Sequence, residues 1–325
     1  MNKSILVIGI ILLFIGMNIT SSSSTIVDKK SIKSISDGNT LYVGGTGEGN
    51  YTKIQSAIDT ASEGDTIFVF DDSAPYSENL LVNKSINLIG EDDESTIIDG
   101  NRNSDVVRII SDKVYIKGFT IRNGGLVFPD GGISIKSSYN VIIGNNLIDN
   151  YYGVVLLYSH NNEIINNHVI DNNQCGIYLE NSSNNNVSGN YIDGQPYNGV
   201  GLWDSSNNNM ISRNTIVNNA YSGIRMLWTA GNIITLNTIS DNLAGVRVEY
   251  SPNVMILKNN FMKNRRLEAF FVGNVFFNNN YTFTNNYWNR PRFLPKIIFG
   301  LLGKPLPIIP WINLDRHPAK EPYDI

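Results

Sequence analysis

Apolar and polar residues alternate along much of the chain, and between residues 130 and 264 the alternation recurs in units of 21 to 24 residues. Each unit opens at a glycine, and the first and third residues after that glycine are apolar in every copy. A period of two is typical of a short strand with one buried face. The glycines that open the units are Gly132, Gly153, Gly176, Gly199, Gly223 and Gly245.

Two polar features recur with the same unit. A small hydroxylated residue stands six positions after each glycine: Ser138, Ser159, Ser182, Ser205, Thr229 and Ser251. A motif Asn-x-apolar-x-x-Asn/Gln follows, beginning at Asn145, Asn167, Asn190, Asn214, Asn237 and Asn259. Asparagine tolerates left-handed backbone and bonds nearby backbone groups. Stacked amides also bond one another. We therefore expect these asparagines at turns, in ladders that run from one unit to the next.

Units of this length without helical periodicity predict an all-β, right-handed parallel β-helix in which each unit is one coil. Less regular copies on both sides extend the expected solenoid to residues 41–290, with the regular coils at 130–264. An amphipathic pattern at residues 52–62 predicts a helix that caps the open N-terminal end, with Thr52 as its N-cap. Residues 291–325 hold seven of the eleven prolines, so we expect an irregular, proline-rich C-terminal cap.

The N-terminus indicates where the protein acts. Lys3 precedes an apolar run at residues 5–19, and small hydroxylated residues follow up to residue 24. This order is typical of a secretory signal peptide, and an uncleaved membrane anchor is the alternative. Residues 25–40 then form a linker. In both cases the remaining chain is expected outside the cytoplasm, secreted or at the cell surface.

Composition narrows the classes of function. A formal net charge of −4 gives no basic footprint for nucleic acid. One cysteine and three scattered histidines argue against a disulfide framework and against a Cys/His metal cluster, so no cofactor is expected. The acidic stretches at residues 71–72 and 91–94 leave Ca²⁺ as an option, with a solvated turn as the alternative.

The outward strand positions carry the candidate chemistry. We expect substrate-binding residues at Tyr158, Tyr178, Trp203, Trp228, Arg247, Glu249 and Tyr250. Aromatic faces stack on the apolar faces of sugar rings, and charged groups hold hydroxyls or carboxylates. The predicted partner is therefore a polysaccharide or another glycan.

A catalytic hypothesis uses the same surface. Glu180 and Asp204 lie one coil apart, so their carboxyl groups are expected about 5 to 9 Å from each other, a range that covers both glycosidase geometries. Arg225 would then stabilise developing negative charge. In the alternative interpretation the surface is a solvated face, and Glu249 pairs with Arg225 or Arg247.

Several segments resemble a known family. "YTKIQSAIDTASEGDTIFVF" (51–70) and "YSENLLVNKSINLIGE" (76–91) resemble the opening of pectin-lyase-fold β-helix proteins, pectin methylesterases included. The Gly-Ile-x-Leu-x-x-Ser-x-x-Asn coils are similar to NosD-type carbohydrate-binding and sugar-hydrolase (CASH) repeats, and "NNYWN" (285–289) is similar to the end of such domains. The resemblance covers about residues 41–290. It implies the fold more strongly than a function.

The sequence departs from the family in two respects. NosD is associated with copper delivery to nitrous oxide reductase, but the thiolate, thioether and imidazole groups that copper favours are not clustered here. The two aspartates and one arginine of pectin methylesterases have no residue-by-residue match. Three hypotheses follow: a carbohydrate-binding or structural surface module, a polysaccharide hydrolase, lyase or esterase, and an accessory protein for a copper enzyme. Membrane contact is expected only through an uncleaved N-terminal segment, and no oligomeric state is indicated.

Overall fold

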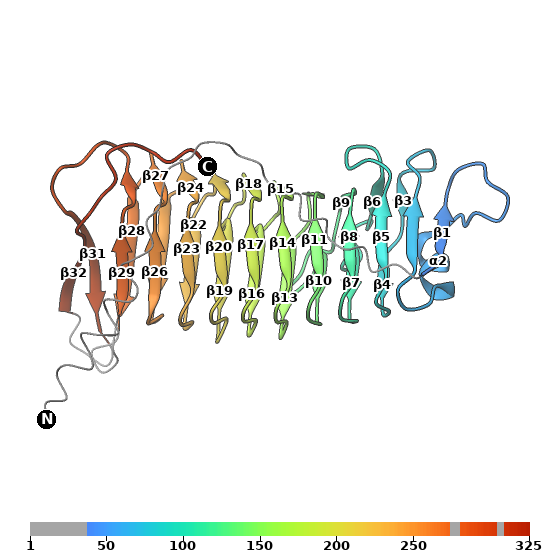
Figure 1. Cartoon of the computed structure of the whole chain (residues 1–325), viewed down its shortest axis with the longest axis horizontal. Coiled ribbons are helices and arrows are strands. Elements are labelled where there is room, and N and C mark those ends of the chain that lie inside the picture. The colour runs from blue at the N-terminus through green and yellow to red at the C-terminus, as the bar shows by residue number, and fades with distance from the viewer. Residues whose placement is uncertain (1–37, 274–279, 304–308) are drawn as a thin grey trace, which may run out of the picture. The chain divides into compact units, whose positions relative to one another are not determined.

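The computed structural model describes residues 38–273, 280–303 and 309–325, all within the unit Ser36–Ile325. The signal peptide or anchor predicted for residues 1–24 lies outside the described residues, as does the linker up to residue 37. Short strands stack in parallel along this unit, as Figure 1 shows, and the regular coils each contribute three of them. No helix in these ranges is long and apolar enough to cross a membrane.

The strands form three ladders, in which each strand pairs with its equivalent in the next coil. Two ladders, joined by a C-terminal hairpin, make one hydrogen-bonded sheet of 22 strands, and the third makes a sheet of 10. The first ladder contains β4 (Leu80–Val82), β7 (Val107–Ile109), β10 (Gly131–Ile135), β13 (Tyr152–Leu157), β16 (Ile177–Glu180), β19 (Val200–Trp203), β22 (Ser222–Leu227), β25 (Ala244–Glu249), β28 (Leu267–Gly273) and β31 (Lys296–Leu302).

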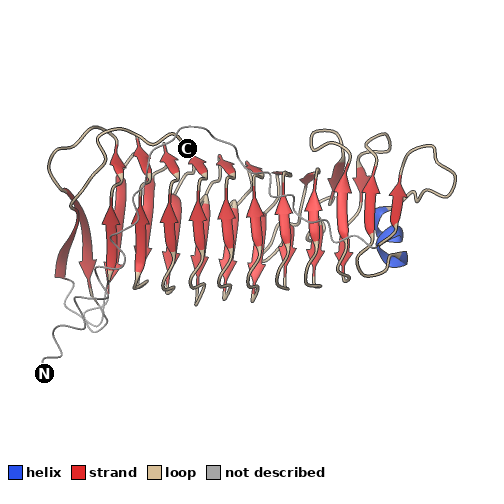
Figure 2. Cartoon of the chain, viewed as in Figure 1, coloured by secondary structure: helices blue, strands red, loops and turns tan. Residues whose placement is uncertain are grey.

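The other two ladders complete each coil. The second contains β1 (Thr40–Val43), β2 (Thr66–Val69), β5 (Asn87–Gly90), β8 (Tyr115–Lys117), β11 (Val141–Ile143), β14 (Glu163–Ile165), β17 (Asn186–Ser188), β20 (Met210–Ser212), β23 (Ile233–Thr235), β26 (Val254–Leu257), β29 (Tyr281–Thr284) and β32 (Ile309–Asp315). The third contains β3 (Tyr76–Ser77), β6 (Ile97–Asp99), β9 (Thr120–Arg122), β12 (Asn146–Ile148), β15 (His168–Ile170), β18 (Tyr191–Asp193), β21 (Thr215–Val217), β24 (Thr238–Ser240), β27 (Asn260–Met262) and β30 (Tyr287–Trp288). Parallel strands that return through the same corners make this a right-handed parallel β-helix, as the repeat predicts. Figure 2 shows the strands of successive coils aligned, with loops and turns between them.

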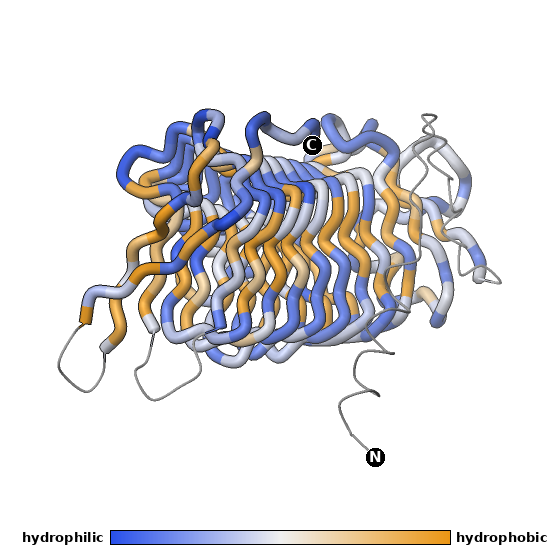
Figure 3. Tube along the Cα trace, turned by 60° about the vertical axis from the view of Figure 1, so that its left-hand side comes forward, coloured by the Kyte–Doolittle hydropathy of each residue, from blue (hydrophilic) through white to orange (hydrophobic). Residues whose placement is uncertain are grey.

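The core is a continuous column of aliphatic side chains inside the coils. Apolar residues at the first and third positions after each coil glycine are fully buried, which confirms the period-two prediction. Apolar and polar positions alternate along the strands in Figure 3. Each coil therefore removes its apolar face from water only against its neighbours.

Asparagine side chains fill the three corners as buried columns. The column between the second and third ladders contains Asn145, Asn167, Asn190, Asn214, Asn237, Asn259 and Asn286. Each side-chain amide in it donates to the Oδ1 of the next asparagine at 2.9 to 3.1 Å. The same Oδ1 also accepts the backbone N–H of the preceding asparagine, for example Asn190 N to Asn214 at 2.9 Å. The predicted ladders are confirmed.

This column has a direction, because each of its Nδ2 groups donates to the Oδ1 of the next residue toward the C-terminus. The last amide therefore needs an acceptor, and buried Asp315 supplies it. Its Oδ2 accepts from Asn286 Nδ2 at 3.2 Å and from Trp288 Nε1 at 2.9 Å. The column between the third and first ladders likewise ends at the Glu268 carboxylate, which accepts from Asn264. Burial raises the pKa of Glu268 above its ordinary value, although the Asn264 bond acts in the opposite direction.

The serine column corrects two sequence assignments. Ser159 N donates to Ser182 Oγ at 3.0 Å, and Ser182 N donates to Ser206 Oγ at 3.1 Å. Ser206, and not the predicted Ser205, occupies the buried position. Asp204 and Ser205 both adopt positive φ, at 37° and 62°, so the turn absorbs one extra residue. The predicted Ser138 is wrong for the same column, because Ser137 is the residue bonded to Asn140.

The two ends of the described unit also differ from expectation. Helix α2 (Ile54–Thr60) buries Ile54, Ala57 and Ile58, but Thr52 is not its N-cap. Lys53 occupies that position without a side-chain hydrogen bond, and the Glu78 carboxylate accepts the Ile54 and Gln55 N–H groups at 2.8 and 3.0 Å. A carboxylate from the next coil thus complements the helix N-terminus.

At the other end, the segment predicted to be irregular contains two regular strands. β31 and β32 pair antiparallel over seven residues each. β31 also continues the first ladder, since it pairs in parallel with β28, and Asp315 of β32 pairs with Phe283 of β29.

The columns predict that alanine substitutions at two adjacent asparagines lower the free energy of unfolding by different amounts. Asn172 is buried, accepts from Asn150 N and Nδ2 at 3.0 and 3.1 Å, and donates to Leu147 O and Ile170 O. Asn172→Ala leaves these buried groups without partners, so we expect the free energy of unfolding to fall by about 2 to 4 kcal/mol.

Asn173 is exposed and provides the control. Asn173→Ala is expected to change the free energy of unfolding by less than about 0.5 kcal/mol. Denaturant unfolding followed by circular dichroism compares the two variants, and equal losses would contradict the role of the column.

Candidate functional site

The outward side of the first ladder gathers most of the predicted site residues in two rows. Strand register aligns the first row as Ser134, Val155, Tyr178, Gly201, Arg225, Arg247 and Phe270. The second row, two residues further along each strand, is Leu157, Glu180, Trp203, Leu227, Glu249 and Val272. We call these two rows the outer face.

An aromatic stack covers the middle coils of the outer face. The Trp203 indole lies against Gly201, where an added Cβ would come within 1.6 Å of the ring. Tyr178 stacks on Trp203 at a centroid distance of 4.8 Å and 25°, and Tyr152 lies 5.0 Å from Tyr178. Gly201 thus makes room for a flat aromatic surface on the outside of the sheet.

The same stack encloses polar and thiol groups. Tyr178 Oη donates to Glu180 Oε2 at 2.7 Å. Burial raises the pKa of Tyr178, and the bond to Glu180 adds to the effect. Cys175 is buried beside Tyr152, and burial raises the pKa of its thiol to about 12. The thiol is therefore neutral at physiological pH.

Charged side chains follow the stack toward the C-terminus. Arg225 donates to Glu249 Oε2 at 2.8 Å and to Tyr197 Oη at 2.7 Å. Arg247 pairs with the other oxygen of Glu249 and also donates to Tyr221 Oη. Burial lowers the pKa of Arg225, but the bond and charge of Glu249 outweigh it and hold the pKa above its ordinary value. One carboxylate thus serves two guanidinium groups. Glu249 is itself buried, contrary to the solvent-facing position expected for it.

The three predicted catalytic residues form separate contacts. Glu180 is bonded to Tyr178, and Arg225 is bonded to Glu249 and Tyr197. Asp204 is exposed in the turn after β19, one residue beyond Trp203, which is the strand partner of Glu180. No hydrogen bond or ion pair joins Glu180, Asp204 and Arg225, all of which lie in described coils. The Arg225–Glu249 pair is the one foreseen for a solvated face.

The remaining predicted binding residues form a rim. Tyr158, Trp228 and Tyr250 follow β13, β22 and β25 at turn positions with positive φ. Tyr158 and Trp228 are 70% and 55% exposed, and Trp228 stacks on Tyr250 at 6.3 Å. Aromatic side chains thus lie both on the outer face and at its edge.

Sequence reasoning missed a further column on this side. Two residues before each coil glycine, or its Glu268 equivalent, stand Asp130, Tyr151, Gln174, Tyr197, Tyr221, Leu243 and Arg266. Tyr197 and Tyr221 stack at 5.1 Å and hold Arg225 and Arg247. The recurrence of tyrosine at this offset was the available signal.

The acidic side chains accept hydrogen bonds from their own turn or from a neighbouring one. Asp72 Oδ1 accepts Gly45 N at 2.9 Å, and Asp71 Oδ2 accepts Ser95 Oγ at 2.6 Å. Backbone N–H groups of Glu94 and Ser95 lower the pKa of Asp92. Within the described ranges, no three His, Cys, Asp or Glu side chains are arranged to hold a metal ion. Calcium binding stays a prediction.

The soft donors of the described residues do not fit a copper site. Cys175 is buried, and His160 Nδ1 already accepts the N–H of Ser183 at 3.0 Å. Met210 and Met255 share one row of the second ladder but are separated by Ile233. Thiolate, thioether and imidazole groups therefore do not converge.

The Gly201–Trp203 contact gives a test of the aromatic stack. Gly201→Ala must push the indole off the strand, and we expect a loss of about 1 kcal/mol of stability together with a red-shifted tryptophan emission. The expected loss disappears in a Trp203→Ala background, because nothing then occupies the space. An equal loss from Gly201→Ala in both backgrounds would show that the indole does not lie there.

The chain is similar to one protein family and to two curated proteins. The model of the family described as periplasmic copper-binding protein (NosD) matches residues 18–297. A cell surface glycoprotein of Methanothermus fervidus is 34% identical over 111 residues, covering 32% of this chain and 18% of that protein. A probable pectinesterase/pectinesterase inhibitor 17 of Arabidopsis thaliana is 27% identical over 126 residues, covering 36% of this chain and 25% of that protein.

The curated relatives are thus much longer than the segments matched. Among solved structures, the Dettilon tailspike protein (gp208) superposes with a TM-score of 0.55 at 14% identity, covering 77% of this chain and 61% of that one. This likeness concerns the fold alone. The family match covers most of the chain, and the chain accordingly belongs to the NosD family of parallel β-helix proteins.

Proposed function

We propose that the chain is an extracytoplasmic module that binds carbohydrate along the outer face. The observation that carries this proposal is the stacked pair of half-buried rings, Tyr178 and Trp203, which Tyr152 supports from below. Flat aromatic surfaces suit the apolar faces of sugar rings, and the neighbouring arginines suit their polar substituents. The rigid ladder fixes the spacing between these groups, so little order has to be created on binding.

The relatives support the proposal through their names. The family is described as periplasmic, and one relative is named a cell surface glycoprotein. Another is named a pectinesterase/pectinesterase inhibitor. Together with the signal peptide predicted for residues 1–24, these names favour a protein at the cell surface or secreted from the cell.

Binding is favoured over catalysis by the contacts of the charged residues. A general acid and base must reach one substrate bond. The arginine assigned to the hydrolase, lyase or esterase hypothesis is instead engaged with Glu249 and Tyr197. The copper-accessory hypothesis has less support, because the soft donors of the described residues are dispersed.

A glycan array on the wild-type protein, followed by titration of the best ligand, tests the proposal. Trp203→Ala and Trp228→Ala are expected to raise the Kd about 10-fold each, which corresponds to about 1.4 kcal/mol. Tyr191→Ala is the control, because this tyrosine lies on the third ladder and bonds Asp193. Absence of any glycan ligand, or an equal effect of the control, would contradict the proposal.

The same ligands separate binding from catalysis. The bound polysaccharide is incubated with wild-type protein and with Asp204→Asn, and new reducing ends, unsaturated products and released ester groups are measured. We expect no turnover with either protein. Turnover that is lost in Asp204→Asn would establish the enzyme hypothesis instead.

A further inference from the structure

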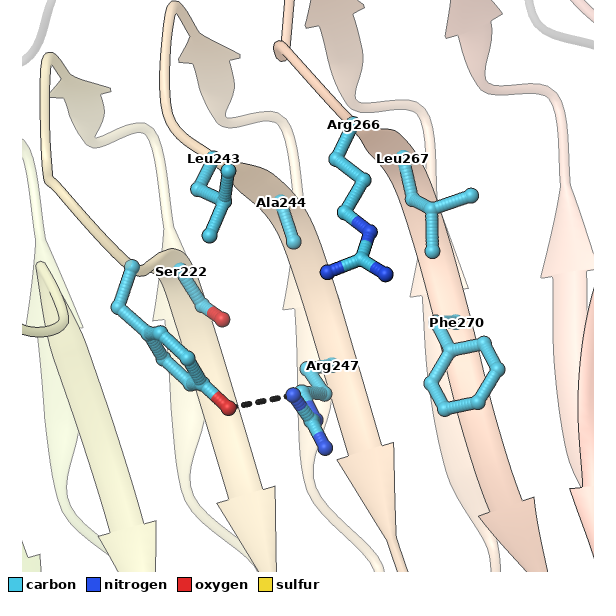
Figure 4. A pocket seen from close by; sticks show the side chains of 8 residues that line it. Ser222, Leu243, Ala244, Arg247, Arg266, Leu267 and Phe270 are labelled. Atoms are coloured by element: carbon cyan, nitrogen blue, oxygen red, sulfur yellow. Dashed lines mark hydrogen bonds between the residues drawn. The ribbon is translucent and has the colours of Figure 1, made fainter.

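A cavity of about 330 Å³ opens on the outer side of the C-terminal coils, where β22, β25 and β28 run side by side (Figure 4). Its lining combines five aliphatic or aromatic side chains with two arginines and a serine. The lining residues are Tyr221, Ser222, Leu243, Ala244, Arg247, Arg266, Leu267 and Phe270. None of them except Arg247 was expected from sequence to belong to a site.

The cavity has a local excess of positive charge. Arg247 shares the Glu249 carboxylate with Arg225, so that carboxylate neutralises only one of the two guanidinium groups. Arg266 is exposed at the cavity, and no carboxylate of the described residues forms an ion pair with it. This excess stands out in a chain with a formal net charge of −4. Electrostatics therefore favour an anionic ligand.

Ser222 supplies an independent observation. The residue is 1% exposed, and its Oγ has no hydrogen-bond partner. Figure 4 shows the Ser222 hydroxyl, Arg247 and Arg266 directed toward the same space. A buried hydroxyl without a partner is unfavourable, and a polar ligand group in the cavity would satisfy it.

The aromatic side chains that line the cavity hold Arg247 in place, and the leucines add apolar surface. The Arg247 guanidinium lies 5.4 Å from the centroid of the Tyr221 ring and 5.9 Å from that of Phe270. Leu243 and Leu267 line the side of the cavity nearest Arg266. The cavity thus offers a fixed cation, a second cation, a hydroxyl and apolar surface within a small volume.

We propose that this cavity binds the carboxylate-bearing ring of an acidic sugar, an inference that rests on the proposed carbohydrate-binding function. The planar guanidinium of Arg266 matches a carboxylate through paired N–H donors. The Ser222 hydroxyl forms a hydrogen bond with a substituent of the sugar ring. The ring carbons contact Leu243, Leu267 and Phe270. A neutral sugar satisfies the hydroxyl but leaves the positive charge uncompensated, so the cavity selects acidic glycans.

The direct probe is titration of the full-length protein with D-glucuronate, D-glucose and glucose 6-sulfate by ligand-observed NMR. We expect glucuronate to bind at least 10-fold more tightly than glucose, and Arg266→Gln to weaken glucuronate at least 10-fold without changing the melting temperature. Arg265→Gln is the matched control. Arg265 is also exposed and adjacent in sequence, but its guanidinium bonds Asn219 O at 3.4 Å and it does not line the cavity.

Failure of this inference is separable from failure of the proposed function. A neutral glycan that binds with Trp203-dependent affinity, while glucuronate shows no preference over glucose, would overturn the inference and leave the function intact. Glucuronate binding that depends on Arg266, with no polymeric glycan bound, would support the cavity and contradict the function. Glucose 6-sulfate binding as tightly as glucuronate would overturn the assignment to a carboxylate.

Discussion

Directional hydrogen bonds between stacked asparagine amides are the constraint on which the structure depends. A buried amide needs an acceptor for its N–H groups and a donor for its oxygen, and an unmet need costs about 1 to 3 kcal/mol. In the corner columns the amide of the neighbouring coil, an asparagine or in one coil Gln195, supplies an acceptor, and backbone carbonyls accept the remaining amide protons. A coil with an apolar residue at that corner, or with its asparagine displaced by one position, would leave groups unpaired on either side. The columns therefore fix the register between coils more strictly than the interchangeable Ile, Leu and Val of the core.

The direction of the columns also explains their C-terminal ends. An amide that donates toward the next coil must finally meet a group that accepts, and a carboxylate does so without presenting a competing donor. Asp315 ends one column and Glu268 another. Glu268 takes the position of the coil glycine, as its alignment beside Gly245 shows. The coil that contains Glu268 thus differs from the preceding coils at the position of the coil glycine, and the residue at that position terminates a column.

Fixed register has a consequence for function. Since equivalent residues align from coil to coil, the outward positions of the first ladder form rows whose chemistry changes only with the side chain. Tyr178, Gly201 and Arg225 follow one another in a single row, so an aromatic surface passes directly into a charged one. Different residues therefore specify the fold and the binding surface. The asparagines that repeat in every coil specify the fold, and the outward residues that differ from coil to coil specify the binding surface.

The features that repeat from coil to coil could be predicted from the sequence, and the features that occur only once could not. The strands, the buried positions and the asparagine ladders were predictable because six copies repeat the same physical requirement. The exchange of Ser205 for Ser206 was not, because a turn absorbs an extra residue without changing the pattern around it. Glu78 capping α2 is a contact between coils that no local motif encodes. Arg266 and Phe270 were missed because Glu268 replaces the glycine from which the repeat was counted.

Hydrogen exchange of asparagine side-chain amides, followed residue by residue by NMR, tests the amide columns most directly. The account predicts that the amide protons of Asn167, Asn190 and Asn214 exchange roughly 100-fold or more slowly than those of exposed Asn173. Protection should also persist along the column as far as Asn286, whose amide donates to Asp315. Exchange of the column amides at the rate of Asn173 would contradict the claim that they hold the coils in register.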